Sequence, residues 1–74
     1  MTAHHFLLQV QQFFPHAGLR TAGPRMYAAY CRDRQAYICY DVETRRWLVE
    51  TANDYLFDDD LANAVSRMTS PIAL

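Results

Sequence analysis

Between residues 26 and 51, runs of aromatic and other apolar residues carry the strongest strand signal in the sequence. This segment holds four of the five tyrosines, both cysteines and the only tryptophan. Aromatic and β-branched residues are enriched in strands, and two polar breaks at residues 32–35 and 43–46 divide the segment. The pattern predicts a three-stranded antiparallel meander with strands at residues 26–32, 35–42 and 46–51.

The two connections set the register of this sheet. A two-residue loop at 33–34 places Cys31 opposite Ala36, and a four-residue loop places Asp41 opposite Arg46, where the two charges form a cross-strand pair. One face of the sheet then collects Tyr27, Ala29, Cys31, Ala36, Ile38, Tyr40, Trp47 and Val49. The other face collects Met26, Ala28, Tyr30, Arg32, Tyr37, Cys39, Asp41, Arg46, Leu48 and Glu50. The first set predicts the core face, and a slip of one residue would mix the two sets. Asp-Arg is not a favoured pair for a tight hairpin, so a longer first loop stays open.

A first helix is predicted at residues 3–14. Phe6, Val10 and Phe13 recur at i, i+4 and i+7, which places them on one side of a helix. Pro15 ends this helix because the residue before a proline disfavours the helical conformation. The following segment, residues 15–25, contains both glycines and two of the three prolines. It predicts a loop, with a short extra strand around Leu19–Thr21 as the alternative.

A second helix is predicted at residues 59–68, after a connection at residues 52–58. Asp58 or Asp59 is the expected N-cap, and an apolar stripe follows it. Residues 69–74 are predicted to form an irregular tail. The stripe consists of Leu61, Ala64, Val65 and Met68.

Together these elements predict one small α+β domain over residues 1–74, in the order α-β-β-β-α. Both terminal helices are expected on the core face of the meander; the alternative is that a helix covers the other face. A chain of this length buries only ~60% of its unfolded surface, so self-association or partner binding would help to stabilise it.

Charge and composition narrow the function classes. The net charge is −1, which argues against a general nucleic-acid binder, and all seven basic residues are arginine. Coding bias is one explanation for the use of arginine without lysine. The functional alternative is that planar guanidinium groups were selected for bidentate binding of anions. The sequence has neither an apolar run of about 20 residues nor a basic and apolar leader, so we expect a cytoplasmic location and no membrane contact. Cys31 and Cys39 are expected on opposite faces and therefore unbridged.

The second sheet face is the strongest candidate for a working surface. Tyrosine and arginine are enriched in protein interfaces, and both occur here beside apolar residues. The predicted partner-binding residues on this face are Tyr30, Tyr37, Arg32, Arg46 and Leu48.

A second candidate is the acidic group formed by Asp54, Asp58, Asp59 and Asp60. Helix capping and solvation explain these carboxylates, and an acidic surface for a partner is the functional alternative. The residue spacing of a calcium-binding loop is missing, so no metal site is predicted.

No catalytic residues are predicted. His4 and His5 are adjacent rather than four residues apart, as a helical zinc pair requires, and nothing near Cys39 in the sequence activates a thiol. We therefore expect no enzyme activity and no cofactor. The expected function is that of a small interaction domain, an inhibitor or adaptor that occludes a macromolecular complex, as small phage inhibitors of host defence do.

Two alternatives to a protein partner stay open. The first is a nucleic-acid-associated protein, in which Tyr30 and Tyr37 stack on bases while arginines bind phosphates. Those arginines are Arg32, Arg34, Arg45 and Arg46. The second is a homodimer formed through the same sheet face.

Overall fold

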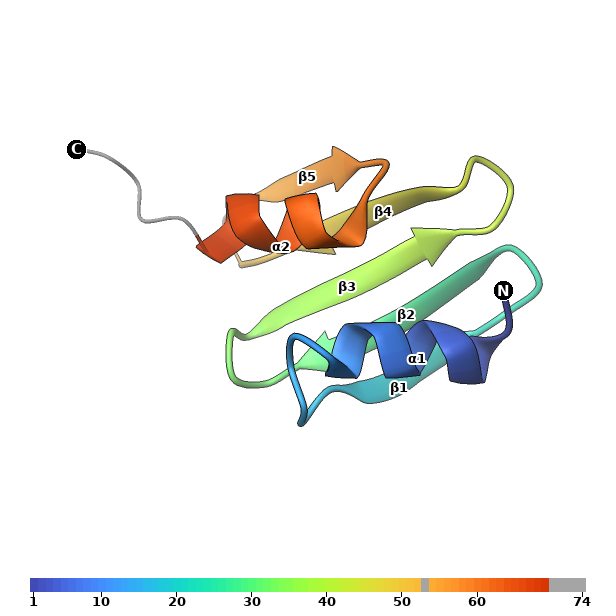
Figure 1. The fold of residues 1–74 in the computed structure, drawn as a ribbon, viewed down its shortest axis with the longest axis horizontal. Coiled ribbons are helices and arrows are strands. Elements are labelled where there is room, and N and C mark those ends of the chain that lie inside the picture. The colour runs from blue at the N-terminus through green and yellow to red at the C-terminus, as the bar shows by residue number, and fades with distance from the viewer. Residues whose placement is uncertain (53, 70–74) are drawn as a thin grey trace.

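The computed structural model describes residues 1–52 and 54–69 (Figure 1). Within them the chain forms an N-terminal helix, a five-stranded antiparallel sheet and a C-terminal helix, which confirms the α+β class. The strands follow one another across the sheet in chain order. The elements are α1 (Ala3–Gln11), β1 (Gly18–Ala22), β2 (Met26–Cys31), β3 (Ala36–Asp41), β4 (Arg46–Glu50), β5 (Tyr55–Asp58) and α2 (Leu61–Thr69).

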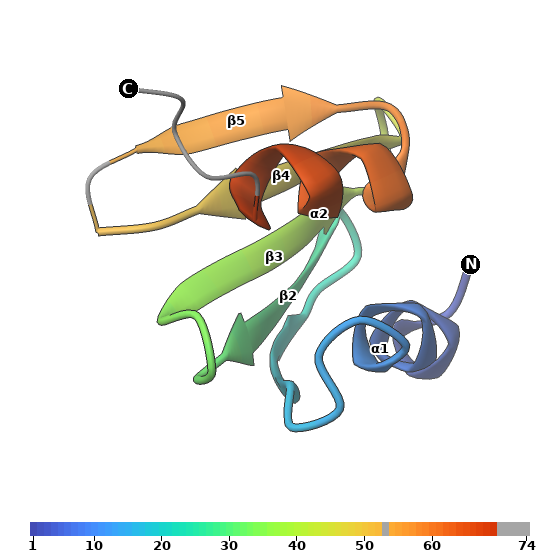
Figure 2. The ribbon, with the colours of Figure 1, turned by 60° about the vertical axis from the view of Figure 1, so that its left-hand side comes forward.

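Both helices pack on the same face of the sheet. α1 lies against β1 and β2, and α2 lies against β4 and β5, as Figures 1 and 2 show from two directions. This arrangement confirms the expected placement and excludes a helix on each face. The side chains between the layers form one apolar cluster, which includes Phe6, Val10, Phe14, Ala29, Ile38, Trp47, Val49, Leu61 and Ala64.

The predicted register of the central strands is confirmed. Cys31 pairs with Ala36 across β2 and β3, and Asp41 pairs with Arg46 across β3 and β4. Because side chains alternate between the faces of a strand, this register separates the two sets of side chains as expected. The partition is what makes one face apolar enough to bind both helices.

The first hairpin loop is longer than the two residues predicted. Four residues, 32–35, connect β2 to β3, and Gln35 has a positive φ of 50°. The second loop, at 42–45, has the same length, and Arg45 has a φ of 59° in the matching position. A two-residue loop of type I′ would require positive φ at both Asp33 and Arg34, whereas the four-residue loop requires it at one residue.

The prediction of three strands was wrong, because both segments expected to be connections contain an edge strand. β1 lies in the expected loop, and β5 lies in the expected link to the second helix. Every residue of β1 is exposed, so the alternating burial that signals a strand is missing from its sequence. β1 pairs with β2 through an irregularity between Leu19 and Thr21, which is the form of a β-bulge.

The helix boundaries also differ from the expected ones. α1 ends at Gln11, and the N–H of Phe13 donates to the carbonyl of Val10, three residues back, at 3.0 Å. This tighter turn leaves Phe13 exposed and buries Phe14 instead. Neither described helix has the length and apolar character needed to cross a membrane.

The N-cap of α2 was also placed one or two residues too early. Its first turn is capped by Asp60, not by Asp58 or Asp59, because the Asp60 side chain accepts from the N–H of Asn63 at 2.9 Å. The predicted tail at 69–74 lies outside the described residues apart from Thr69, which ends α2.

Candidate functional site

The face of the sheet that points away from both helices is the candidate site, and we call it the open face. No described element covers it. It is apolar for a solvent-facing surface: Tyr55 is 64% exposed, Phe57 48% and Tyr37 40%. Its side chains come from β2 to β5 and are Met26, Ala28, Tyr30, Tyr37, Cys39, Asp41, Arg46, Leu48, Glu50, Tyr55 and Phe57.

A shallow depression of about 220 Å³ lies on this face, and we call it the apolar hollow. Cross-strand pairing places the small side chain of Cys39 beside Leu48, which in turn lies beside Phe57. The depression forms because the short side chain of Cys39 stands among taller neighbours. The residues lining it are Met26, Cys39, Asp41, Thr44, Arg46, Leu48 and Phe57.

Two charged residues of the rim are held by contacts of their own. The guanidinium of Arg46 lies 5.5 Å from the centre of the Phe57 ring and pairs with Asp59 at 3.3 Å. The Asp41 carboxylate accepts from the backbone N–H of Glu43 at 3.0 Å. The predicted Asp41–Arg46 ion pair is therefore not among the salt bridges of residues 1–52 and 54–69, although the two residues face each other across the strands.

These hydrogen bonds determine the ionisation of Asp41. Desolvation alone raises the pKa of Asp41, but the hydrogen bonds from Thr44 and Glu43 together outweigh it and hold the pKa below its usual value. The apolar hollow thus has a fixed negative charge on one side and the Arg46 guanidinium on another.

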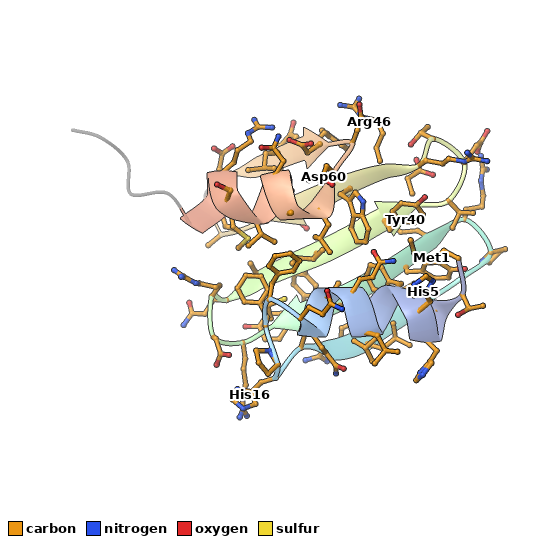
Figure 3. All side chains as sticks on the ribbon, viewed as in Figure 1. Met1, His5, His16, Tyr40, Arg46 and Asp60 are labelled. Atoms are coloured by element: carbon orange, nitrogen blue, oxygen red, sulfur yellow. The ribbon has the colours of Figure 1, made fainter. Side chains whose placement is uncertain are left out.

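A second depression, of about 340 Å³, lies where β1 and β2 meet the loop after α1, and we call it the basic corner. Arg20 stands over the ring of Tyr30 at 5.3 Å, and Tyr30 in turn contacts Tyr37 with ring centroids 4.9 Å apart. Figure 3 shows His16 at the opposite end of the molecule from Arg46. The lining residues are His16, Gly18, Leu19, Arg20, Tyr30 and Arg32.

The structure divides the predicted partner-binding residues between these two features. Arg46 and Leu48 line the apolar hollow, whereas Tyr30 and Arg32 line the basic corner. Tyr37 lies on the open face and contacts Tyr30 of the basic corner. Four contributors were not among the predicted site residues: Tyr55, Phe57, His16 and Arg20. The last two were recognised in the sequence as part of a locally basic loop, but no site was predicted there because the glycine spacing of a phosphate-binding loop is absent. The sequence signal for the first two was the aromatic content of Tyr55-Leu56-Phe57, because aromatic residues are enriched in strands.

The predicted acidic group serves the local structure. Asp58 pairs with Arg67 at 3.1 Å, and the backbone N–H of Asp60 is the main cause that lowers the pKa of Asp58. Asp59 pairs with Arg46, and Asp54 accepts from the N–H of Tyr55 at 2.8 Å. Among the described residues, no group of three or more potential ligands is arranged to hold a metal ion. A partner-binding role for these carboxylates stays a prediction.

Both cysteines are unbridged and buried, with Cys31 on the core face and Cys39 only 8% exposed on the open face. Burial raises the pKa of the Cys31 thiol to about 11, and burial followed by the charge of Glu50 raises that of Cys39. Neither thiol is therefore activated as a nucleophile, because the reactive form is the thiolate.

Comparison with protein-family models, with curated proteins and with solved structures finds no significant match for this chain. The class that can be stated is an α+β meander with one helix-covered face and one open, aromatic face. Because a fold does not determine a function, the evidence for a function comes from the residues of the open face.

Proposed function

We propose that this chain is a non-enzymatic interaction domain that binds a protein partner through the open face. The observation that supports the proposal is the exposure of Tyr37, Tyr55 and Phe57 on a sheet face that no described helix covers. Contiguous exposed apolar patches on small proteins commonly mark binding surfaces, and aromatic residues supply much of the binding energy there.

The apolar hollow indicates what the partner presents. Its base is formed by Cys39 and Leu48, and its rim carries Asp41 and Arg46. A segment with one apolar anchor, such as leucine or methionine, flanked by a basic and an acidic residue, complements both its shape and its charges. A single anchor in a partly desolvated pocket is the usual arrangement of an interface hot spot.

Occlusion is the mode of action that fits these features. The open face offers shape and charge but no activated nucleophile, so binding would act by covering a surface of the partner, as an inhibitor or adaptor does.

A nucleic acid is a weaker fit to the same face. Arg32 and Arg34 lie in the loop between β2 and β3, whereas Arg45 and Arg46 lie at the other end of β3, so the four do not form one track. The carboxylate of Glu50 also interrupts the aromatic row, since it pairs with Tyr37 on one side and Tyr55 on the other. A phosphate backbone that followed the tyrosines would cross this negative charge.

The test compares variants of the open face with a matched control on the opposite side. Phe57→Ala and Tyr37→Ala remove exposed aromatic rings, and Leu8→Ala removes an apolar side chain of α1 that is 47% exposed. Tagged proteins are used to capture partners from host lysate with and without nuclease, and light scattering gives the mass of each pure protein. Circular dichroism confirms that the variants fold.

The proposal expects a stoichiometric protein that survives nuclease, binds wild type and Leu8→Ala alike, and binds Phe57→Ala at least about tenfold more weakly. Equal capture by all four proteins, wild type and the three variants, overturns it. A dimer of the pure chain that Phe57→Ala dissociates replaces the foreign partner with a second copy. Loss of the captured material with nuclease moves the function to nucleic acid.

A further inference from the structure

We propose that the basic corner is a binding site for a phosphate monoester. The basic corner is separate from the apolar hollow, and phosphate binding there does not depend on the function proposed above. The proposal rests on three observations about the corner: the charges that lack partners, the contacts that hold the side chains in place, and the acidic residue that limits the site on one side.

The first observation concerns the pairing of the arginines. Arg25, Arg46 and Arg67 each pair with a carboxylate, from Glu43, Asp59 and Asp58 respectively. In the described part of the chain, Arg20 and Arg32 have no such partner, and both line the same depression of about 340 Å³. Two guanidinium groups that share a depression and are not paired with a carboxylate form an attractive site for an anion.

The second observation is that the corner is held in place by its neighbours. The Tyr30 ring supports Arg20 from below at 5.3 Å, and Tyr37 supports Tyr30 in turn. His16 is oriented by Asp33, whose carboxylate accepts from Nδ1 at 3.2 Å. Side chains that are oriented before binding lose less conformational entropy when the ligand arrives.

The arrangement of the donors favours phosphate over carboxylate. The two donor side chains, Arg20 and Arg32, come from separate segments: strand β1 and the loop between β2 and β3. A carboxylate has two oxygens in one plane and suits a single guanidinium. The three terminal oxygens of a phosphate monoester diverge and can accept from two guanidinium groups on separate segments at once.

The third observation favours a single dianion over a polyanion. In the cross-strand row that starts at Gly18 and Tyr30, the next residues are Tyr37 and then Glu50. A chain of phosphates leaving the corner along this row would meet the Glu50 carboxylate two strands away. The positive charge is therefore local, and it matches one doubly charged group.

The experiment is a titration of the full chain, followed by heteronuclear NMR, with inorganic phosphate, O-phosphoserine and a peptide that contains phosphoserine. Chloride at matched ionic strength, acetate and an oligothymidylate serve as comparison ligands. The expected result is saturable shifts of the Nε–H signals of Arg20 and Arg32, with a Kd of about millimolar for phosphate. Arg20→Gln/Arg32→Gln should weaken binding by about tenfold or more.

Arg45→Gln is the matched control. Arg45 also has no carboxylate partner within the described ranges, but it lies in the loop between β3 and β4, and Gln35 shows that glutamine tolerates the same positive φ. Wild-type affinity in this variant, beside loss in the double variant, supports the site. Dispersed spectra of both variants show that each is folded.

The remaining outcomes distinguish a phosphorylated protein from a small phosphorylated molecule, and they include the results that contradict the site. Tighter binding of the phosphopeptide than of inorganic phosphate identifies a phosphorylated protein, and equal affinity identifies a small phosphorylated molecule; both support the site. Shifts that do not saturate, or that chloride or acetate reproduces, overturn it. Tighter binding of oligothymidylate, with shifts reaching Glu50 and Tyr55, replaces the site with a nucleic-acid surface.

Discussion

Phe6 of α1 stacks on Trp47 of β4, with ring centroids 5.7 Å apart and ring planes 16° apart. Tyr27 of β2 contacts the same Phe6 ring at 5.5 Å, so one helical side chain connects two strands that are not neighbours in the sheet. Phe6 has no exposed surface, and its position explains how a nine-residue helix is held on the sheet.

Phe6→Ala should lower the free energy of unfolding by about 3–5 kcal/mol, because it removes a buried ring and leaves a cavity between α1 and β4. Denaturant unfolding followed by circular dichroism measures this loss. Leu8→Ala, in the same helix but half exposed, should change stability by about 0.5 kcal/mol or less. A similar loss in the two variants would contradict the role given to the Phe6 ring.

Gln35→Gly should raise the free energy of unfolding by about 0.5–1 kcal/mol. A side chain at φ 50° lies in the left-handed region, which costs about 1–2 kcal/mol, and glycine removes that cost at the expense of some unfolded-state entropy. Thermal or denaturant unfolding measures the gain. Arg34→Gly is the control, because the φ of Arg34 is not positive. This substitution should lower the free energy of unfolding, and an increase would contradict the explanation given for Gln35.

Cys39 should react slowly with iodoacetamide in the folded protein and quickly in denaturant. Burial, followed by the charge of Glu50, raises the pKa of this thiol, so little thiolate forms near neutral pH. Glu50→Gln should raise the alkylation rate modestly, by about two- to threefold, because one of the two causes is removed. Mass spectrometry of the modified peptides distinguishes Cys39 from Cys31, whose rate should not change.

Asp58→Asn should destabilise the protein at neutral pH and have no such effect in strong acid. Hydrogen bonds from Asp60, Arg67 and Asn63 lower the pKa of Asp58 in the folded state, so the stabilisation is complete above the unfolded value of about 3.9. It is lost as the pH falls through the lower, folded value. Unfolding measured from pH 7 to pH 2 should show the two proteins converging, and a gap that is independent of pH would contradict this.

The register of the central strands could be predicted from the sequence because the two hairpins give the same division of side chains between the faces. Ile38 pairs with Ala29 in the first hairpin and with Val49 in the second, and both pairings place it on the core face. A slip in either hairpin would have moved charged residues to the core side. That internal check made the open face predictable down to Tyr30, Tyr37 and Leu48.

The edge strands lacked such a check. β1 is exposed along its whole length and lies among glycine and proline, so its sequence resembles a loop. β5 adjoins a run of three aspartates, and capping of the next helix explained that region without a strand. The basic corner could not be predicted either, since it depends on β1 bringing Arg20 over Tyr30.

The chain-order topology of the sheet has a consequence for how the protein folds. Each strand pairs only with its neighbours in the sequence, and the loops between β2 and β3 and between β3 and β4 have four residues each. The contact order of the sheet is therefore low, and hairpins of this kind form in about 1–10 μs. The central hairpins need no distant segment in order to close. Docking of α1, which requires Phe6 to reach Trp47, is the step that joins parts of the chain far apart in sequence.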